Sequence, residues 1–332
     1  MLSAILSFVI ALALSWHITP LIRTGAIKLN IVDRPDGKLK NQETAIPYLG
    51  GVAVFISFLF SLALTFSDFD PQVMGLLLGG SIVVMLGIID DVGNLPPEVK
   101  LMGEVIAALA MIKCGIMIRL SFIPEWISIP LTFFWLVGMT NALNLIDIMD
   151  GLSAGVSFVS CFFLFVIAQW NHNQAIAVAT LALAGSLLGF LRYNFFPAKI
   201  YLGDAGSLLL GLLLGAMAMI GRYTERSSLG LVAPLMILGV PLFEMIFVSY
   251  IRYRRGMSIL RGSNDHFALR LRKWALSKQA TVLLAYGISV VLGVCSLILI
   301  SVTTAWAGLI VFLVIAFFLL AGYLLKKIDM TM

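Results

Sequence analysis

Repeated long apolar runs limit this 332-residue chain more than any other feature. A helix needs roughly 20 predominantly apolar residues to cross a bilayer, and eleven segments approach that length and composition. The eleven segments lie near residues 2–22, 46–66, 73–89, 99–113, 127–144, 152–169, 175–192, 205–221, 229–250, 280–301 and 305–325. Backbone groups inside lipid must be hydrogen-bonded within the protein, which helices achieve. The sequence therefore predicts an all-α, polytopic integral membrane protein with about eleven transmembrane helices in the lipid bilayer.

The composition supports a membrane protein over a soluble one. Hydrophobic residues make up 61% of the chain and charged residues only 12%, whereas a soluble domain is about 25% charged. The alternative, a soluble protein with a very apolar core, does not suit so many long apolar runs. The net charge of +5 gives no reason to expect a nucleic-acid partner.

The short loops favour one domain. No small-residue cleavage site follows the first run, which ends at Arg23, so we expect an uncleaved first helix and not a signal peptide. Loops such as 67–72 leave no room for a soluble domain, and we see no internal repeat. Residues 1–332 are therefore predicted to form a single membrane-embedded domain.

The basic residues predict the orientation. Of the 22 Lys and Arg residues, 18 lie in the loops after odd-numbered spans or in the C-terminal tail. Loops rich in Lys and Arg remain in the cytoplasm. This rule places the N-terminus outside and the C-terminus in the cytoplasm.

Five polar stretches fall on the predicted cytoplasmic side, at residues 33–38, 88–94, 141–151, 201–207 and 263–273. The orientation was assigned from Lys and Arg alone, yet it gathers separated acids on one surface. These acids are Asp90, Asp91, Asp147, Asp150 and Asp204. We therefore expect them to form one site.

The acids suit a hard metal ion. Asp147 and Asp150 are three residues apart and continue a row begun by Asn141 and Asn144, which predicts one helical face. Clustered carboxylates repel one another unless a cation lies among them or some are protonated. No His or Cys joins this group, so Mg²⁺ completed by water and substrate phosphates is favoured over zinc. The three cysteines are scattered singly, which indicates neither a zinc site nor a disulfide framework.

Taken singly, these features have simpler explanations. A carboxylate such as Asp204 at a span end is often a helix cap, and the basic loop 252–278 is largely accounted for by the cytoplasmic charge bias. His266 is weak evidence by itself. Glu104 and Glu244 fall inside predicted spans and should face the protein interior, with Glu104 close enough to reach the site.

The ordered motifs nevertheless resemble those of the polyprenyl-phosphate N-acetylhexosamine-1-phosphate transferases, the group that includes MraY, TagO and WecA. "IIDD" resembles the family's paired aspartates, "NALNLIDIMDGL" its Asn-x-x-Asn-x-x-Asp-x-x-Asp-Gly motif, and "YLGDAGS" its Gly-Asp-x-Gly-Ser motif. The first-loop sequence "DRPDGKLK…IPYLGG" is nearer the TagO/WecA branch. The resemblance covers nearly the whole chain.

The resemblance implies roles for individual residues. Asp204 would be the main Mg²⁺ ligand, with Asp147 as a second metal residue and Mn²⁺ as an alternative ion. Asp90 and Asp91 would lie beside the metal and the lipid phosphate, with a role as base open for one of them. The substrate-binding residues implied are Asn144, Asp147, Asp150, Lys100, Tyr201 and His266.

Three positions depart from the family pattern. Ile148 stands where the family usually has Gly, Asn41 lies near the position of a common first-loop His, and His266 alone remains of a His-rich loop. These changes leave the metal site intact and leave the donor sugar open.

The resemblance implies an Mg²⁺-dependent transferase in the bacterial inner membrane, with its active site on the cytoplasmic face. It would move N-acetylhexosamine 1-phosphate from a UDP-N-acetylhexosamine, UDP-GlcNAc foremost, to a polyprenyl phosphate lipid. The products, UMP and a polyprenyl-diphosphate sugar, would begin cell-envelope glycan synthesis such as lipopolysaccharide or teichoic acid. Transfer of phospho-MurNAc-pentapeptide is the alternative within the family.

Two alternatives come from other classes, an ion-coupled transporter and a non-catalytic lipid-binding scaffold. A transporter should carry its acids in mid-bilayer on broken helices. The acids here lie at span ends. The sequence leaves open whether the protein forms a homodimer.

Overall fold

The computed structural model describes residues 1–34, 45–93, 95–120, 122–221, 223, 228–258 and 263–330. It divides the chain into two compact units, Met1–Ile220 (unit 1) and Gly221–Met332 (unit 2). Several residues used in the sequence analysis lie outside the described part, namely Lys38, Lys40, Asn41, Arg222, Arg226 and Arg261.

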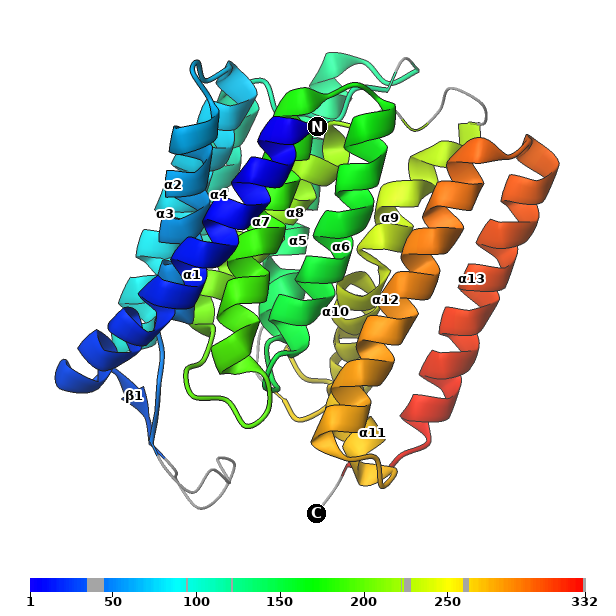
Figure 1. Ribbon diagram of the computed structural model, residues 1–332. Helices are drawn as coiled ribbons and strands as arrows, with labels where there is room; N and C mark the ends of the chain where they lie inside the picture. Colours follow the sequence, from blue (N-terminus) through cyan, green and yellow to red (C-terminus); the bar gives the residue numbers. More distant parts are fainter. Residues whose placement is uncertain are drawn as a thin grey trace. The chain divides into compact units, whose positions relative to one another are not determined.

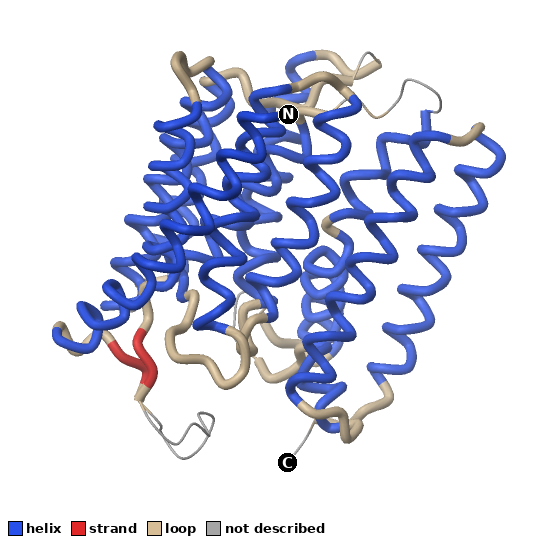
Figure 2. The backbone as a smooth tube through the Cα atoms, viewed as in Figure 1, coloured by secondary structure: helices blue, strands red, loops and turns tan. Residues whose placement is uncertain are grey.

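In its described residues, unit 1 is a bundle of eight helices with one short hairpin, whose arrangement Figures 1 and 2 show. Its helices are α1 (Leu2–Lys28), α2 (Gly50–Thr65), α3 (Pro71–Gly93), α4 (Pro97–Lys113), α5 (Glu125–Ile146), α6 (Leu152–Trp170), α7 (Gln174–Asn194) and α8 (Gly203–Met219). Strands β1 (Val32–Asp33) and β2 (Ile46–Pro47) pair antiparallel after α1. The hairpin was not predicted, because two-residue strands leave no periodic signal in the sequence.

Unit 2 contains the 3₁₀ helix η1 (Ser228–Val232) and five α-helices. These are α9 (Ala233–Ile237), α10 (Gly239–Arg254), α11 (Phe267–Lys273), α12 (Lys278–Ser301) and α13 (Thr304–Lys326). Stacked rings of Phe243, Phe247 and Phe318 join α10 to α13.

The prediction of an all-α polytopic membrane protein is confirmed. Among the described residues, seven helices are long and apolar enough to cross a membrane, or eight if one bent pair counts as a span. The seven are α1, α3, α5, α6, α7, α12 and α13. The apolar helices α2 and α8 are shorter, so the count of eleven spans stays a prediction.

The ninth predicted span, near 229–250, is not one straight helix. Ser228–Ile237 and Gly239–Arg254 meet at a bend of 78°. Pro234 and Pro241 flank the bend, and proline lacks the N–H that an uninterrupted helix needs. The apolar composition predicted one continuous span here and could not reveal the break.

Helix α8 forms the core of unit 1. Gly203 and every residue from Ala205 to Ala218 are buried, and the helix packs against α2, α3, α5 and α6. At the crossing with α2, a Cβ atom on Gly51 would lie 2.0 Å from the backbone nitrogen of Gly206. The first turns of α2 and α8 are therefore in backbone contact, which fixes where α8 begins.

We predict that Gly51→Ala destabilises the protein. The added methyl group meets backbone atoms of α8, which cannot rotate away, so the cost should be about 2–3 kcal/mol and Tm should fall by roughly 5 °C or more. Gly138→Ala on α5 is the matched control, because a Cβ there meets nothing within 4 Å. Thermal unfolding of the purified protein in detergent would measure both variants. A Gly51→Ala protein as stable as its parent would contradict this packing.

Candidate active site

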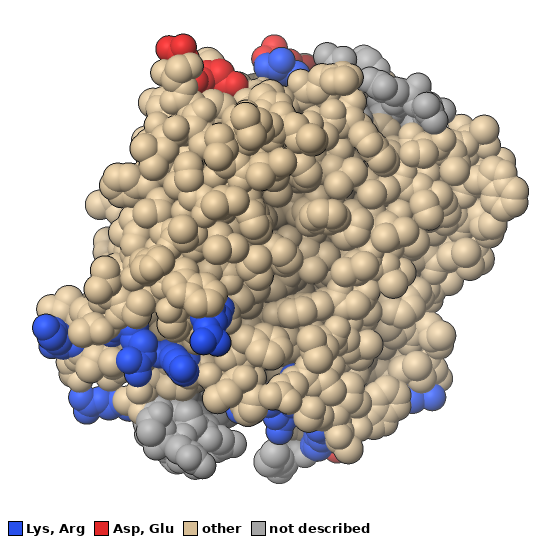
Figure 3. All heavy atoms as spheres, viewed as in Figure 1, with Lys and Arg blue, Asp and Glu red and all other residues tan. Residues whose placement is uncertain are grey.

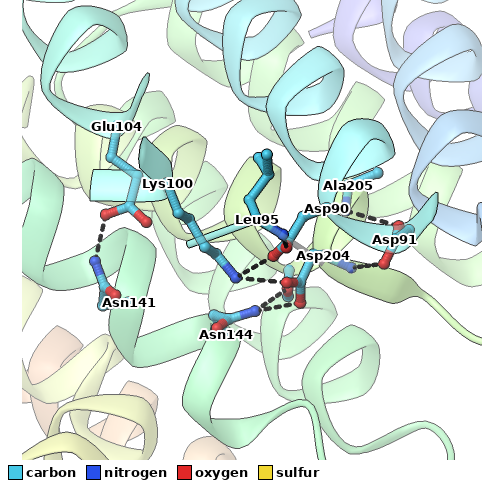
Figure 4. Close-up of polar contacts among 10 residues, drawn as sticks. Asp90, Asp91, Leu95, Lys100, Glu104, Asn141, Asn144, Asp204 and Ala205 are labelled. Atoms are coloured by element: carbon cyan, nitrogen blue, oxygen red, sulfur yellow. Dashed lines mark hydrogen bonds and ion pairs between the residues drawn. The ribbon is translucent and has the colours of Figure 1, made fainter. Parts of the chain in front are cut away.

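Two helices of unit 1 bring three carboxylates together. Asp90 and Asp91 lie in the last turn of α3, and Asp204 lies in the first turn of α8. Because α3 and α8 pack against each other, the end of one meets the start of the other (Figure 4). The predicted convergence of these three residues is confirmed.

Asp91 holds the start of α8. Its Oδ1 accepts a hydrogen bond from the backbone N–H of Asp204 at 2.8 Å, and its Oδ2 accepts from that of Ala205 at 3.3 Å. First-turn N–H groups have no partner within their own helix and attract negative charge. Gly203 has φ +72°, and a Cβ there would lie 2.6 Å from Asp91 Oδ2, so glycine permits this close approach.

Lys100 bridges two of the carboxylates. Its Nζ lies 3.0 Å from Asp90 Oδ2 and 2.5 Å from Asp204 Oδ2. Lys100 reaches them from the first turn of α4, and the three side chains remain partly exposed, 12% for Asp90, 17% for Lys100 and 31% for Asp204. The other oxygen of Asp90 accepts from the N–H of Leu95 at 2.6 Å. Sequence reasoning grouped Lys100 with the site, and the structure confirms that position.

Asn144 orients the remaining oxygen of Asp204. Its Nδ2 donates to Asp204 Oδ1 at 2.7 Å and to Ser207 Oγ at 2.8 Å. Asp204 is thus held from three elements: α4 through Lys100, α5 through Asn144 and α3 through Asp91 at the backbone (Figure 4). Its carboxylate is oriented before any ligand binds.

The prediction that Asp147 and Asp150 share one helical face is wrong. Helix α5 ends at Ile146, with Asp147 as its C-cap, and Asp150 lies in the turn before α6. Gly151, the N-cap of α6, has φ +76°, a left-handed backbone conformation that glycine adopts readily where the turn enters the next helix. The face shared at three-residue spacing extends only over Asn141 and Asn144.

The two carboxylates nevertheless lie in the same neighbourhood. Burial raises the pKa of the Asp147 carboxyl well above its ordinary value, and the charges of nearby carboxylates, Asp204 first, add to the rise. Asp150 Oδ2 accepts from the N–H of Ala198 at 3.0 Å. Asp150 therefore ties the turn after α5 to the segment before α8.

Sequence reasoning missed Asn194, which is buried at the end of α7. Its Oδ1 accepts from the N–H of Gly151, and its Nδ2 donates to the carbonyl of Ile200, both at 3.0 Å. The side chain thereby joins the turn that follows α5 to the turn that precedes α8. A single Asn near a span end gives no sequence signal for such a role.

Tyr201 lies where the first loop meets α8. Its N–H donates to the carbonyl of Pro47 at 2.9 Å, and its carbonyl accepts from the N–H of Gly50 at 2.9 Å. The ring lies 6.0 Å from that of Tyr48 between centroids. Pro47 and Gly50 thus hold the segment that leads into Asp204.

Tyr48 and Asp33 form a second group. Asp33 belongs to the polar stretch 33–38, but its contact with Tyr48 was not predicted. The Tyr48 hydroxyl is hydrogen-bonded to Asp33, which is 7% exposed. Burial raises the pKa of Tyr48 above its ordinary value, and the bond to Asp33 adds to the rise. The stretch "IPYLGG" contains Tyr48, but the sequence analysis used it only as part of the family resemblance.

His266 belongs to unit 2, where its partner is Glu244. His266 Nδ1 lies 2.5 Å from Glu244 Oε1, and Glu244 Oε2 accepts from the N–H of Phe267 at 3.1 Å. Glu244 is fully buried, and these two contacts explain its presence within an apolar helix. Asp265 beside it pairs with the buried Arg270 at 2.7 Å. The residues directly before α11, Asp265 and His266, are therefore held by buried charges.

The donor atoms of unit 1 are compatible with a hard cation. Asp90, Asp91, Asp147 and Asp204 bring four carboxyl groups to one neighbourhood, and Lys100 supplies one positive charge beside them. Within the part of the chain that the structure describes, no three His, Cys, Asp or Glu side chains are grouped closely enough to hold a metal ion on their own. An ion that takes one or two carboxylates and completes its shell with water and phosphate oxygens would not need such a group.

Comparison with known proteins decides the family. Residues 73–222 match the model of Glycosyl transferase family 4, and this range contains all the site residues of α3, α4, α5 and α8. A probable undecaprenyl-phosphate N-acetylglucosaminyl 1-phosphate transferase of Bacillus subtilis (strain 168) is 32% identical over 325 residues, which cover 96% of this chain and 90% of the relative.

The chain belongs to the polyprenyl-phosphate N-acetylhexosamine-1-phosphate transferase family.

Other members of this family are also similar. An undecaprenyl-phosphate alpha-N-acetylglucosaminyl 1-phosphate transferase of Salmonella typhi is 27% identical over 328 residues, covering 92% of this chain and 87% of the relative. A phospho-N-acetylmuramoyl-pentapeptide-transferase of Halalkalibacterium halodurans is 32% identical over 303 residues, covering 83% of this chain and 90% of the relative. The family resemblance of the sequence motifs is thus confirmed.

Proposed function

We propose that this chain transfers N-acetylglucosamine 1-phosphate from UDP-GlcNAc to a polyprenyl phosphate. The products are UMP and a polyprenyl-diphosphate-linked N-acetylglucosamine. One observation carries the proposal: α4 and α5 hold the carboxylate of Asp204, and α3 holds its backbone N–H, at one end of a membrane-embedded bundle. Relatives named for this transfer match most of the chain.

The reaction exchanges one phosphorus–oxygen bond for another. An oxygen of the lipid phosphate forms a bond to the phosphorus that carries the sugar. The bond from that phosphorus to the oxygen bridging to UMP breaks, and UMP leaves with the electron pair. A lipid phosphate is already largely ionised near neutral pH, so no strong base is needed. Such a reaction depends mainly on positioning and on neutralising charge.

Within this reaction Lys100 and Asn144 have separable tasks. Lys100 lies between Asp90 and Asp204, where its ammonium group would neutralise an oxygen of the diphosphate. Asn144 keeps Asp204 in one orientation. Tyr201, beside Tyr48, would stack on the uracil ring, with Asp147 and Asp150 beside the nucleotide sugar.

Asp204, with Asp147, would hold Mg²⁺, or Mn²⁺ in its place. The support is the excess of carboxylates over the single ammonium of Lys100 and the absence of sulfur or imidazole donors among the unit 1 residues that form this site. When bound, the ion would act as a Lewis acid on the diphosphate oxygens.

The donor sugar is proposed from the names of the relatives. The similarity to a phospho-N-acetylmuramoyl-pentapeptide-transferase keeps UDP-MurNAc-pentapeptide as the second candidate. Release of UMP from each donor, with a polyprenyl phosphate present, distinguishes the two. We expect turnover with UDP-GlcNAc and little with the pentapeptide donor. The product would then feed a cell-envelope glycan.

A transporter fits the structure less well. Its coupling acids should lie at mid-bilayer on broken helices, whereas Asp90, Asp91 and Asp204 lie in terminal turns. A lipid-binding scaffold would bind the acceptor lipid and release no UMP. Release of UMP in the same assay would therefore exclude a scaffold.

We predict that Asp204→Asn lowers UMP release at least about 100-fold. The neutral amide lacks the negative charge that would hold Lys100 and the divalent ion beside the reacting phosphates. The fold should survive, since the amide still accepts a hydrogen bond from Lys100. The assay uses purified protein, UDP-GlcNAc, polyprenyl phosphate and Mg²⁺. Asp68→Asn, in the exposed loop between α2 and α3, is the control and should match the parent. Near-normal release by Asp204→Asn would remove Asp204 from the site.

We also propose that this site faces the cytoplasm, with the N-terminus outside and the C-terminus inside. On the visible face of unit 1, Lys and Arg gather beside the end of α1 that leads into the hairpin, and acidic side chains appear at the opposite margin (Figure 3). Basic residues mark the cytoplasmic side of bacterial inner-membrane proteins.

Labelling of single cysteines tests the orientation. In a background without the three native cysteines, we predict that Asp68→Cys reacts with a membrane-impermeant maleimide on intact spheroplasts and that Lys199→Cys reacts only after permeabilisation. Both positions are exposed, so access to the side chain is equal. Labelling of Lys199→Cys in intact spheroplasts would reverse the proposed orientation.

A further inference from the structure

We propose that Glu104 is a positioning residue. Through Asn141 it holds α4 against α5, and this contact lets Lys100 and Asn144 reach the same carboxylate, Asp204. The inference rests on the proposed function, because it concerns how that site is built.

The polar residues of α4 and α5 form two successive layers (Figure 4). In the layer nearest the helix ends, Lys100 and Asn144 both contact Asp204. One turn further along α4, Glu104 accepts a hydrogen bond from Asn141, which lies one turn earlier on α5. Residues three or four apart share a helix face, so each helix contributes one residue to each layer.

Glu104 is suited to a fixed contact because it is 2% exposed. A buried carboxyl group without a polar partner is costly within a membrane. The Nδ2 group of Asn141 donates both to Glu104 and to the carbonyl of Val137, the latter at 3.0 Å. The bond to its own helix restrains the amide, so its second N–H remains directed at α4.

The contact between Glu104 and Asn141 matters because Lys100 and Asn144 must both reach the carboxylate of Asp204. Lys100 Nζ contacts Asp204 Oδ2, while Asn144 Nδ2 contacts Asp204 Oδ1. A shift of α4 along α5 would therefore move one of the two donors away from its oxygen. Glu104 itself contacts neither Asp204 nor Asp90 in the hydrogen-bond network of the site, which makes it a positioning and not a catalytic residue.

Two substitutions separate the hydrogen bond from the charge. Glu104→Gln keeps an oxygen that accepts from Asn141, whereas Glu104→Ala keeps neither acceptor nor charge. We expect Glu104→Ala to lower kcat about 10- to 100-fold, the scale of a displacement of about 1 Å, with KM for the donor changed less than about threefold. Glu104→Gln should stay within about threefold of the parent in both constants. These are values per folded enzyme, with folding checked by thermal unfolding.

A double-mutant cycle tests whether Glu104 acts through Lys100. If it does, adding Glu104→Ala to Lys100→Ala should lower kcat by less than about threefold further. Three outcomes would overturn the proposal. The double variant could show the full loss of both single variants, or Glu104→Ala could keep the kcat of the parent. The third outcome is a Glu104→Gln protein as slow as Glu104→Ala.

A measurement without turnover separates this proposal from the proposed reaction. In the parent protein Lys100 is engaged by two carboxylates, so it should react slowly with an amine-modifying reagent followed by mass spectrometry. Glu104→Ala should increase the reactivity of Lys100 at least about threefold and leave Lys113, exposed at the other end of α4, unchanged. Failure of the reaction assay in the parent overturns the proposed function alone, whereas unchanged Lys100 reactivity overturns the positioning role.

Discussion

The site in unit 1 depends on the hydrogen bonds and ion pair that hold Asp204. A carboxylate beside three others is unfavourable unless positive or donor groups surround it. Here Lys100 and Asn144 occupy its two oxygens, and Asp91 accepts from the N–H of its backbone. The helices that supply these groups are separated in sequence, so the site exists only when the bundle is assembled.

A buried helix makes this arrangement rigid. Helix α8 is enclosed along nearly its whole length, and its first turn touches the first turn of α2 at backbone distance. Pro47 and the first residues of α2, Gly50 and Gly51, add backbone bonds to Tyr201 and Leu202 on the approach to Asp204. Binding energy from substrates therefore need not be used to order the acid, which is the condition for efficient charge stabilisation in the transition state.

Hydropathy and charge predicted the membrane class, and the ordered motifs predicted which acids meet. They succeeded because apolar length and acidic motifs are local properties of the sequence. The break at Leu238 and the end of α5 before Asp147 were not predicted, although Pro234, Pro241 and Gly151 lie close to them in the sequence. The partner of Glu244 was not predicted because its bonds to His266 and Phe267 join residues in different elements. Asn194 was missed for the same reason, since its two partners belong to two different turns.

In the proposed reaction, a divalent ion and the diphosphate of the donor would meet at Asp204. The most direct measurement is anomalous diffraction from crystals of the protein grown with Mn²⁺ and UDP-GlcNAc. We expect a manganese peak at coordination distance from the Asp204 carboxylate and from a phosphate oxygen of the nucleotide. An ordered nucleotide with its manganese peak away from Asp204 would contradict it.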